Sequence, residues 1–450
     1  MREIDVGEAV QGARLGPFQI ATFALCVLIL FVDGLDYSSV NVGAPFIMRA
    51  FKIETSDFSW VFSWGFVGFF IGSVLFGYLG DKWGRKWGAI AAVLTYTVPS
   101  LLTVLASSVD ELSLYRCLAG CGIGGVIPNT VALLNETAPK KYRVMFVMAA
   151  FVGYSSGNAA MGPIAATFIP MFGWPVVFLI AGAAGTLLAL VLLLFLPESI
   201  PFLAATKPEA PQLRQLIARA APELKIAPDA RFVLRRPLNE TKFSLKLLFD
   251  GERAIVTPLL WLAFFAETLT YITLSSWMAV LLERAGLAPQ TASNVYGYAA
   301  LGAVAAILIV GVSLDRFGPR ASVFSALVAV TATVALGTPG LSPALIVIFA
   351  IFAMGFGSAT HNSLLGIVGG FYPTIVRGNG VGFATSMGRI AAIFGPGIAG
   401  YLLARLPLQY VLIAIAAPDL IVAAVCVVLA RFKDQASEAA TRETGATAHG

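Results

Sequence analysis

The stretch FVDGLDY, residues 31–37, places two carboxylates in the middle of the first long apolar segment, Phe18 to Ile47. A charged side chain at the centre of a membrane helix costs about 2.5–3.5 kcal/mol on insertion scales, so an acid there is a functional candidate that needs a partner. Asp33 and Asp36 are three residues apart, which puts them on one helix face with Tyr37. This face must be turned toward protein or water, and the remainder of the chain must supply its surroundings.

The composition identifies a multi-pass membrane protein. The chain is 58% hydrophobic and 12% charged, and its mean hydropathy is +0.83, far from the values of soluble domains. Each membrane span needs about 20 apolar residues. The sequence predicts twelve spans: Phe18 to Ile47, Phe58 to Leu79, Gly88 to Ala106, Leu112 to Leu134, Val144 to Pro170, Trp174 to Leu196, Ala254 to Leu282, Thr291 to Leu314, Ala321 to Leu336, Pro343 to Gly369, Gly378 to Ala404 and Leu408 to Ala430.

One long polar segment divides the spans into two sets of six. We expect an N-terminal half at 1–196, a cytoplasmic linker at 197–253, a C-terminal half at 254–431 and a disordered cytoplasmic tail at 432–450. The linker contains an Ala/Leu-rich run at 211–221, which indicates short amphipathic helices on the cytoplasmic surface rather than a domain.

The distribution of positive charge predicts the orientation. If both termini are cytoplasmic, the outer loops contain only four basic residues, two more lie within spans, and all the others of the 30 Lys and Arg are inside. This asymmetry favours cytoplasmic termini. We therefore expect a multi-pass protein of the bacterial-type inner (plasma) membrane.

Two loops repeat at the same distance along the chain. DKWG at 81–84 recurs as DRFG at 315–318, and the PxxxR pattern that ends at Arg143 recurs ending at Arg377, an offset of 234 in both cases. The agreement predicts two six-helix halves related by a parallel repeat. Such halves place the substrate site near the bilayer midplane between them.

The loop after the second span resembles the signature loop of the major facilitator superfamily, and this resemblance covers essentially the whole chain. The resemblance implies that the loop is a latch between helices, which biases the side of the membrane to which the cavity opens. The alternative is that its positive charges only fix the orientation of the chain in the membrane. The glycines permit close helix approach and a tight turn. The gating candidates are Gly77, Gly80, Asp81, Gly84, Arg85 and Lys86, with Asp315 and Arg316 in the weaker copy.

Further motifs resemble the aromatic acid:proton symporter family within that superfamily. They are DGLD at 33–36, RCLAGCGIGGVIPN at 116–129, LPES at 196–199, YPTIVR at 372–377, GRI at 388–390 and GP at 395–396. The resemblance implies uptake of a small aromatic carboxylate together with protons. The partners are then this substrate and the lipid bilayer, the proton is the coupling ion, no cofactor is needed, and we expect a monomer.

Two arginines lie within predicted spans, too deep to act as membrane anchors. Arg389 lies about eleven residues into its span, or ~16 Å, and Arg116 lies a few residues inside the outer end of its own. A guanidinium retains its charge when buried and matches a carboxylate with its planar fork. Both are candidates for binding an anionic substrate. Alternatively each neutralises an acid, and Arg116 in particular is a possible partner of Asp33 or Asp36.

Other polar side chains within the spans are weaker candidates for the substrate site. His361 and Asn362 lie mid-span in a helix that the resemblance implies lines the cavity, where His361 is open to a proton-relay role or a structural one. Tyr37, Tyr271, Asn129, Tyr154 and Asn158 are candidates for ring or substituent contacts, although such residues are often structural in membrane helices. For Asp419 we expect local pairing.

Glu267 departs from the family pattern and follows from the repeat. Adding 234 to Asp33 gives Glu267, and adding it to Tyr37 gives Tyr271. We expect the two faces to meet across the cavity. Three roles are open for Glu267: a second protonation site beside Asp33 and Asp36, a contact to a polar substituent of the substrate, or a structural ion pair.

Several classes of function are excluded by what the sequence lacks. It contains no nucleophile with a base, no phosphate-binding loop and no soluble basic domain for nucleic acid. Cys117 and Cys121 share a helix face without other ligand types nearby, so no metal site is expected. The alternatives to an importer are a proton-coupled exporter of organic anions or drugs, and a non-transporting membrane sensor of the same fold.

Overall fold

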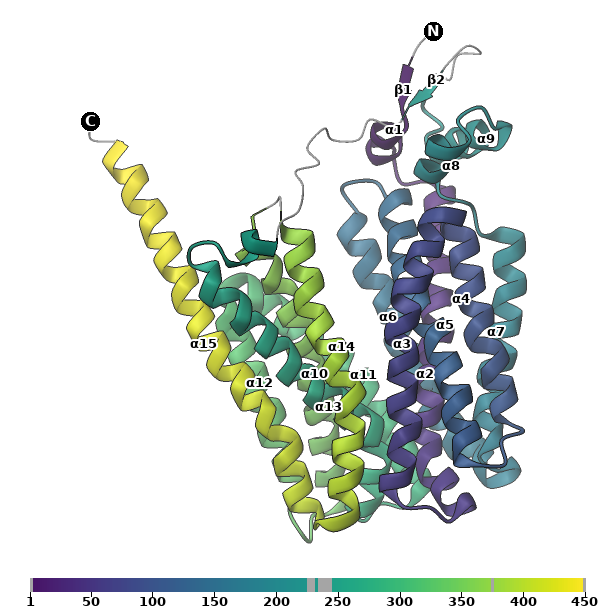
Figure 1. The fold of residues 1–450 in the computed structure, drawn as a ribbon, viewed down its shortest axis with the longest axis vertical. Helices are drawn as coiled ribbons and strands as arrows, with labels where there is room; N and C mark the ends of the chain where they lie inside the picture. The colour runs from purple at the N-terminus through teal and green to yellow at the C-terminus, as the bar shows by residue number, and fades with distance from the viewer. Residues whose placement is uncertain (1–2, 225–230, 234–244, 374–375, 448–450) are drawn as a thin grey trace. The chain divides into compact units, whose positions relative to one another are not determined.

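In the computed structural model, residues 3–224, 231–233, 245–373 and 376–447 are described (Figure 1). The chain forms two compact units. The N-terminal unit comprises residues 1–53 and 60–240, and the C-terminal unit comprises residues 54–59 and 241–450. Each unit is described by itself below.

Six long helices build the N-terminal unit: α2 (Pro17–Phe51), α3 (Thr55–Trp83), α4 (Arg85–Thr103), α5 (Val109–Thr137), α6 (Arg143–Phe172) and α7 (Pro175–Phe195). Six more build the C-terminal unit: α10 (Arg253–Arg284), α11 (Pro289–Phe317), α12 (Pro319–Leu336), α13 (Pro343–Val368), α14 (Arg377–Arg405) and α15 (Leu408–Thr447). Short 3-10 turns at Leu245–Phe249 and Gly369–Phe371 precede α10 and α14. The predicted fold class, two six-helix halves of an all-α membrane protein, is confirmed.

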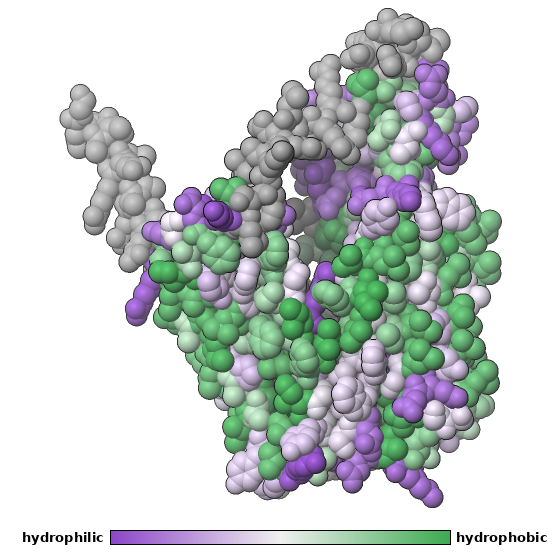
Figure 2. Space-filling model, viewed as in Figure 1, coloured by the Kyte–Doolittle hydropathy of each residue, from purple (hydrophilic) through white to green (hydrophobic). Residues whose placement is uncertain are grey.

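The helices have the dimensions and surface of membrane spans. Within the described residues, ten of them are long and apolar enough to cross a membrane by length and composition alone; α4 and α6 complete the two sets of six. Figure 2 shows hydrophobic side chains along the middle of the helices and hydrophilic ones gathered toward the ends. Helix α15 runs on to Thr447 and includes most of the segment that we expected as a tail.

Local sequence fixes where the helices begin. Proline occupies the first turn of α7, α11, α12 and α13, where its missing N–H would have no intrahelical partner in any case. Ser108 caps α5 by accepting a hydrogen bond from the Glu111 backbone, and Ser342 caps α13 in the same way. The span limits predicted from the apolar runs are close to these boundaries for that reason.

The helix starts follow the repeat. Helices α3, α4, α5 and α6 begin at residues 55, 85, 109 and 143, and α11, α12, α13 and α14 begin at 289, 319, 343 and 377. Each pair differs by 234, the offset predicted from the two loops. Position 33 on α2 therefore corresponds structurally to position 267 on α10.

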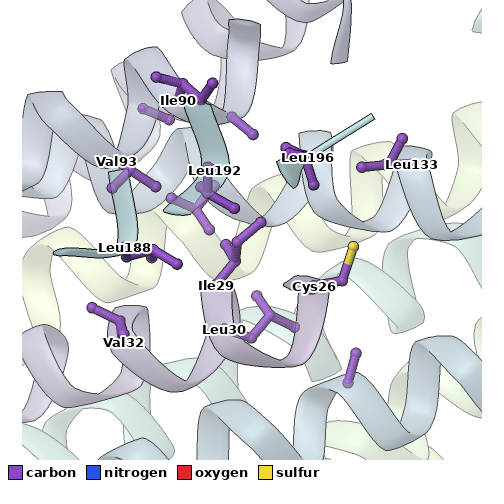
Figure 3. Packing of buried hydrophobic residues seen from close by; sticks show 14 of the residues in the cluster. Cys26, Ile29, Leu30, Val32, Ile90, Val93, Leu133, Leu188, Leu192 and Leu196 are labelled. Atoms are coloured by element: carbon purple, nitrogen blue, oxygen red, sulfur yellow. The ribbon is translucent and has the colours of Figure 1, made fainter. Parts of the chain in front are cut away.

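An apolar core holds the N-terminal unit together (Figure 3). Cys26, Ile29 and Leu30 of α2 are fully buried, and they belong to one cluster with Ile90 of α4 and Leu192 of α7. Cys26, Ile29 and Leu30 precede Asp33 by seven, four and three residues, so this packing continues along the helix face that carries the acids. The acidic face of α2 is thus held in a defined direction.

A small second core lies at one end of this unit, around short elements that the sequence predicted only in part. Strand β1 (Glu3–Asp5) pairs in parallel with β2 (Arg231–Val233), and α1 (Val6–Gly12) packs with α8 (Ile200–Thr206) and α9 (Pro211–Ala220) (Figure 1). Helix α9 is amphipathic, as expected. Its apolar face is covered by the N-terminal segment, a partner about 200 residues away that no local pattern could indicate.

Candidate functional site

The two acids of α2 are completely buried. Asp33 and Asp36 have no exposed surface, and α6 passes close to the turn between them. A side chain at Gly34 would collide with the backbone carbonyl of Tyr154, so only glycine permits this crossing. The close approach of α6 covers α2 beside the two acids.

Asp36 is held by an arginine and a serine. Arg116 Nη1 of α5 lies 3.5 Å from Asp36 Oδ2, and the Ser100 hydroxyl donates to Asp36 Oδ1. Arg116 Nη2 in turn donates to Ser100 Oγ at 2.8 Å and Thr103 Oγ1 at 3.2 Å, and the guanidinium carbon lies 4.9 Å from the centre of the Phe178 ring. The predicted alternative of an ion pair between Arg116 and a helix acid is therefore present.

Asp33 has no such support. Neither of its carboxyl oxygens has a hydrogen-bond partner among the described residues. The hydroxyls of Tyr96 and Thr97 on α4 are also buried without partners, and Tyr96 is close enough to Asp33 for electrostatic interaction. An ionised carboxylate in such a position is expensive, whereas a protonated one is far less so.

A pocket opens beside the Arg116 network, and aromatic rings line it. It holds about 430 Å³ of empty space, the part open to solvent included. Tyr37 packs edge-on to Phe66 with ring centres 6.4 Å apart, and tilted to Tyr154 at 6.1 Å. The lining residues are Tyr37, Val40 and Asn41 of α2, Val61, Phe62, Gly65, Phe66 and Phe69 of α3, and Arg116, Gly120 and Ile123 of α5.

In the C-terminal unit, a histidine meets the repeat-related acid. His361 Nδ1 of α13 lies 2.6 Å from Glu267 Oε2 of α10, and the Thr268 hydroxyl donates to the same oxygen at 3.3 Å. The Tyr271 ring stacks on the imidazole with centres 5.6 Å apart. The structure thus brings His361, which the sequence proposed separately, to Glu267 and Tyr271, which the repeat had placed together.

The other candidates of the C-terminal unit lie on α13, α14 and α15. Asn362 of α13 donates to the Ser358 carbonyl one turn earlier. Arg389 is half-buried on α14. Asp419 is buried on α15 with Oδ1 unpartnered among the described residues.

The signature loop of the N-terminal unit is stabilised by ionic contacts. Arg85 pairs with Asp81 at 2.6 Å and with Glu136 of α5 at 3.3 Å. Lys86 Nζ donates to the Leu193 carbonyl of α7. These contacts connect α3, α4, α5 and α7 at one end of the unit.

The carboxyl group of Glu198, a residue that follows α7 in the chain, lies at the start of α4. Its Oε1 accepts hydrogen bonds from the backbone N–H groups of Lys86 at 3.1 Å and Ser199 at 2.8 Å. Gly84 has φ +102°, and a side chain there would collide with the Glu198 carboxyl group. Burial raises the pKa of Glu198 above its usual value, although the N–H groups of Ser199 and Lys86 oppose that shift.

Two of the predicted contact residues, Asn129 and Asn158, are buried and are not among the residues that line the pocket. Asn129 donates to the carbonyls of Phe76 and Gly125 and lies against Gly80 of the signature loop, so it is not among the residues that line the pocket. Asn158 is buried on α6. In the weaker copy of the loop, Arg316 lies 5.3 Å from the ring centre of Phe317, and the Asp315 side chain lies outside the described residues. The glycine at 77 has open space around it.

The sequence did not identify the pocket wall formed by α3, nor Ser100. Phe62, Phe66 and Phe69 have the spacing of one helix face, which is a signal that could have been used. Ser100 gives no local signal, because its role depends on α4 meeting both Asp36 of α2 and Arg116 of α5 in the folded unit. Within the described ranges, no three His, Cys, Asp or Glu side chains lie together as metal ligands would.

Comparisons with known proteins agree with this architecture. The sequence profile of the Major Facilitator Superfamily matches residues 26–297 and 259–449. The benzoate transport protein of Acinetobacter baylyi is 29% identical, covering 93% of this chain and 91% of that protein. The gallate transporter of Pseudomonas putida is 31% identical, covering 92% and 93%, and the 4-hydroxybenzoate transporter of Pseudomonas aeruginosa is 30% identical, covering 90% of each.

Solved structures share the fold at low sequence identity. A bacterial homologue of the human lysosomal transporter Spinster has a TM-score of 0.69 at 16% identity, covering 93% of this chain and 98% of that chain. The xylose transporter XylE of Escherichia coli has a TM-score of 0.68 at 13% identity, covering 91% and 97%. The profile, the relatives and the two six-helix units lead to one assignment: the chain belongs to the Major Facilitator Superfamily.

Proposed function

We propose that this protein imports a small aromatic carboxylate together with protons, across an inner (plasma) membrane with both chain termini in the cytoplasm. The observation that carries the proposal is the pocket of the N-terminal unit, where Tyr37, Phe62, Phe66 and Phe69 surround a space that also reaches Arg116. Aromatic side chains favour an aromatic ring in offset or edge-on geometry. The names of the relatives, which include benzoate, 4-hydroxybenzoate and gallate transporters, support the same substrate class.

Arg116 suits the carboxylate end of such a substrate. Its Nη atoms are engaged by Asp36, Ser100 and Thr103, but its Nε–H is a buried donor without a hydrogen-bond partner in the described residues. An incoming anion would satisfy that donor and add a second negative charge near Asp36. Arg389 of the C-terminal unit is the second proposed anchor.

Within this proposal, Asp33 is the group that exchanges the proton. Asp36 has a standing cation, whereas Asp33 has none. Protonation of Asp33 therefore changes the energy of the buried acidic face more than protonation of Asp36 would. The empty site with Asp33 ionised and the loaded site with Asp33 neutral have the same net charge but hold it in different places, so the two states differ in energy, which is the requirement for biasing alternating access.

The test is uptake of labelled benzoate into proteoliposomes with an imposed pH gradient, acidic outside. We expect accumulation above the equilibrium ratio, its loss on adding a protonophore, and its loss in Asp33→Asn while the protein remains folded. Cyclohexanecarboxylate is the control for the ring, and benzamide is the control for the charge.

Each of the other possible outcomes would contradict one part of the proposal. Accumulation that requires the reverse gradient would indicate an exporter, and binding without flux would indicate a sensor. Equal uptake of cyclohexanecarboxylate would contradict the aromatic site. Equal binding of benzamide would contradict the arginine anchors. Concentrative uptake by Asp33→Asn would contradict the role of Asp33.

A further inference from the structure

Glu267 and His361 together connect the interior of the C-terminal unit to an accessible surface. The Glu267 side chain is 1% exposed and that of His361 is 29% exposed, yet the two lie 2.6 Å apart. Glu267 Oε1 is buried without a hydrogen-bond partner in the described part of the chain. The imidazole has two nitrogens, one on the carboxylate and one free to exchange a proton elsewhere, as in a relay.

Asp419 extends this connection deeper. The Thr270 hydroxyl of α10 donates to the Ile415 carbonyl of α15 at 2.9 Å. Thr270 lies three residues after Glu267, and Ile415 lies four residues before Asp419, so this bond aligns the two helix faces that carry the acids. The two carboxyl groups are within electrostatic range of each other, and the Asp419 carboxyl also bonds Thr270.

Burial favours a proton on Asp419. Its side chain is 1% exposed, and Oδ1 has no hydrogen-bond partner among the described residues. A neutral carboxyl group is the form that such burial tolerates.

The helices packed against this part of α10 supply few other titratable groups. Tyr271 lies on α10 itself, His361 on α13, Arg389 on α14 and Asp419 on α15. The tyrosines of α11 are Tyr296 and Tyr298. Within this set, imidazole is the side chain that ordinarily exchanges protons near neutral pH, and Glu267 is the carboxyl group in contact with it.

We propose that His361, Glu267 and Asp419 form a second proton-binding site, which takes up and releases one proton in each transport cycle. A proton arriving at Nε2 of His361 lets the Nδ1 proton pass to Glu267, so the imidazole returns to its neutral form. The Glu267 carboxyl group then holds the proton, within electrostatic range of Asp419. The consequence for transport rests on the proposed proton-coupled import, whereas the proton site itself does not.

The first experiment measures the number of protons moved per benzoate, from the reversal potential in proteoliposomes. Wild type should move one more proton per benzoate than Glu267→Gln or Asp419→Asn. The matched control is Glu283→Gln, the same substitution sixteen residues further along α10, or ~24 Å away; it should retain the wild-type value. Wild-type stoichiometry in Glu267→Gln would overturn the proposal.

The second experiment needs no substrate. Infrared spectra of the purified protein at neutral pH should contain a protonated carboxyl band that Asp419→Asn lacks. Thr270→Val retains Asp419 and should shift this band, which keeps the test valid if Asp419→Asn does not fold. Unchanged spectra in the variants would overturn the proposal. If the carboxyl band changes in these variants as expected but wild type transports no aromatic acid, the proposed function fails and the proton site stands.

Discussion

Helices α2 and α10 hold repeat-related positions in the two units, but their acids have different partners. On α2, Asp33 and Asp36 lie side by side, and Asp36 is paired with Arg116. On α10, Glu267 takes the position of Asp33, while Thr270 takes that of Asp36 and the second acid, Asp419, is on α15. The partner of Glu267 is a histidine.

The difference lies in whether the partner can lose its charge. A guanidinium remains protonated in proteins, so Arg116 supplies a permanent positive charge to the N-terminal unit. An imidazole ordinarily titrates near neutral pH, so the partner of Glu267 is a group that can lose its charge. The same scaffold thus holds one fixed ion pair and one adjustable pair.

The largest effect should follow from removing the fixed charge. Arg116→Gln leaves Asp36 buried without a cation and should lower the free energy of unfolding by about 3–5 kcal/mol. The double variant Arg116→Gln, Asp36→Asn removes both charges and should recover much of this loss. Unfolding in detergent micelles, compared among wild type, single and double variants, measures it. A single variant as stable as wild type would show that the ion pair is not structural.

The same substitution at the adjustable pair should cost less. His361→Gln should lower the free energy of unfolding by about 1.5–3 kcal/mol, because it removes one hydrogen bond to a charged group. The assay is again unfolding in micelles, with Arg116→Gln as the reference. A loss as large as that of Arg116→Gln would remove the distinction between the two units.

The aromatic pocket gives a third, smaller comparison. Tyr37 lines it, whereas its repeat mate Tyr271 stacks on His361. Tyr37→Leu should weaken benzoate binding by about 0.5–1.5 kcal/mol, the usual contribution of an aromatic pair, and Tyr37→Phe should retain most of the affinity. Equilibrium binding in micelles measures both. If Tyr271→Leu weakens binding more than Tyr37→Leu does, the ring is bound by the C-terminal unit instead.

The smallest effect concerns Glu198, for which the repeat has no acid: the corresponding position is Phe432. Burial raises the pKa of Glu198, so its stabilising contribution is complete at acid pH and is lost as the pH rises through the raised pKa. Glu198→Gln does not titrate. The melting temperature of the variant relative to wild type should therefore increase from acid to neutral pH. A difference that is constant with pH would show that Glu198 retains its ordinary pKa.

The sequence by itself determined the membrane class, the twelve spans and the repeat offset, because apolar run length, prolines and capping serines act locally along each helix. The two arginines and the acids of α2 and α10 were also identifiable, since charge at membrane depth is costly wherever it occurs. Only the tertiary structure decided which partners they have. Ser100 joins Asp36 to Arg116, His361 reaches Glu267 from α13, and Asp419 meets Thr270 from α15, contacts between residues 16 to 149 positions apart in the chain. Such pairings depend on which helices are neighbours, and no pattern within a single helix records that.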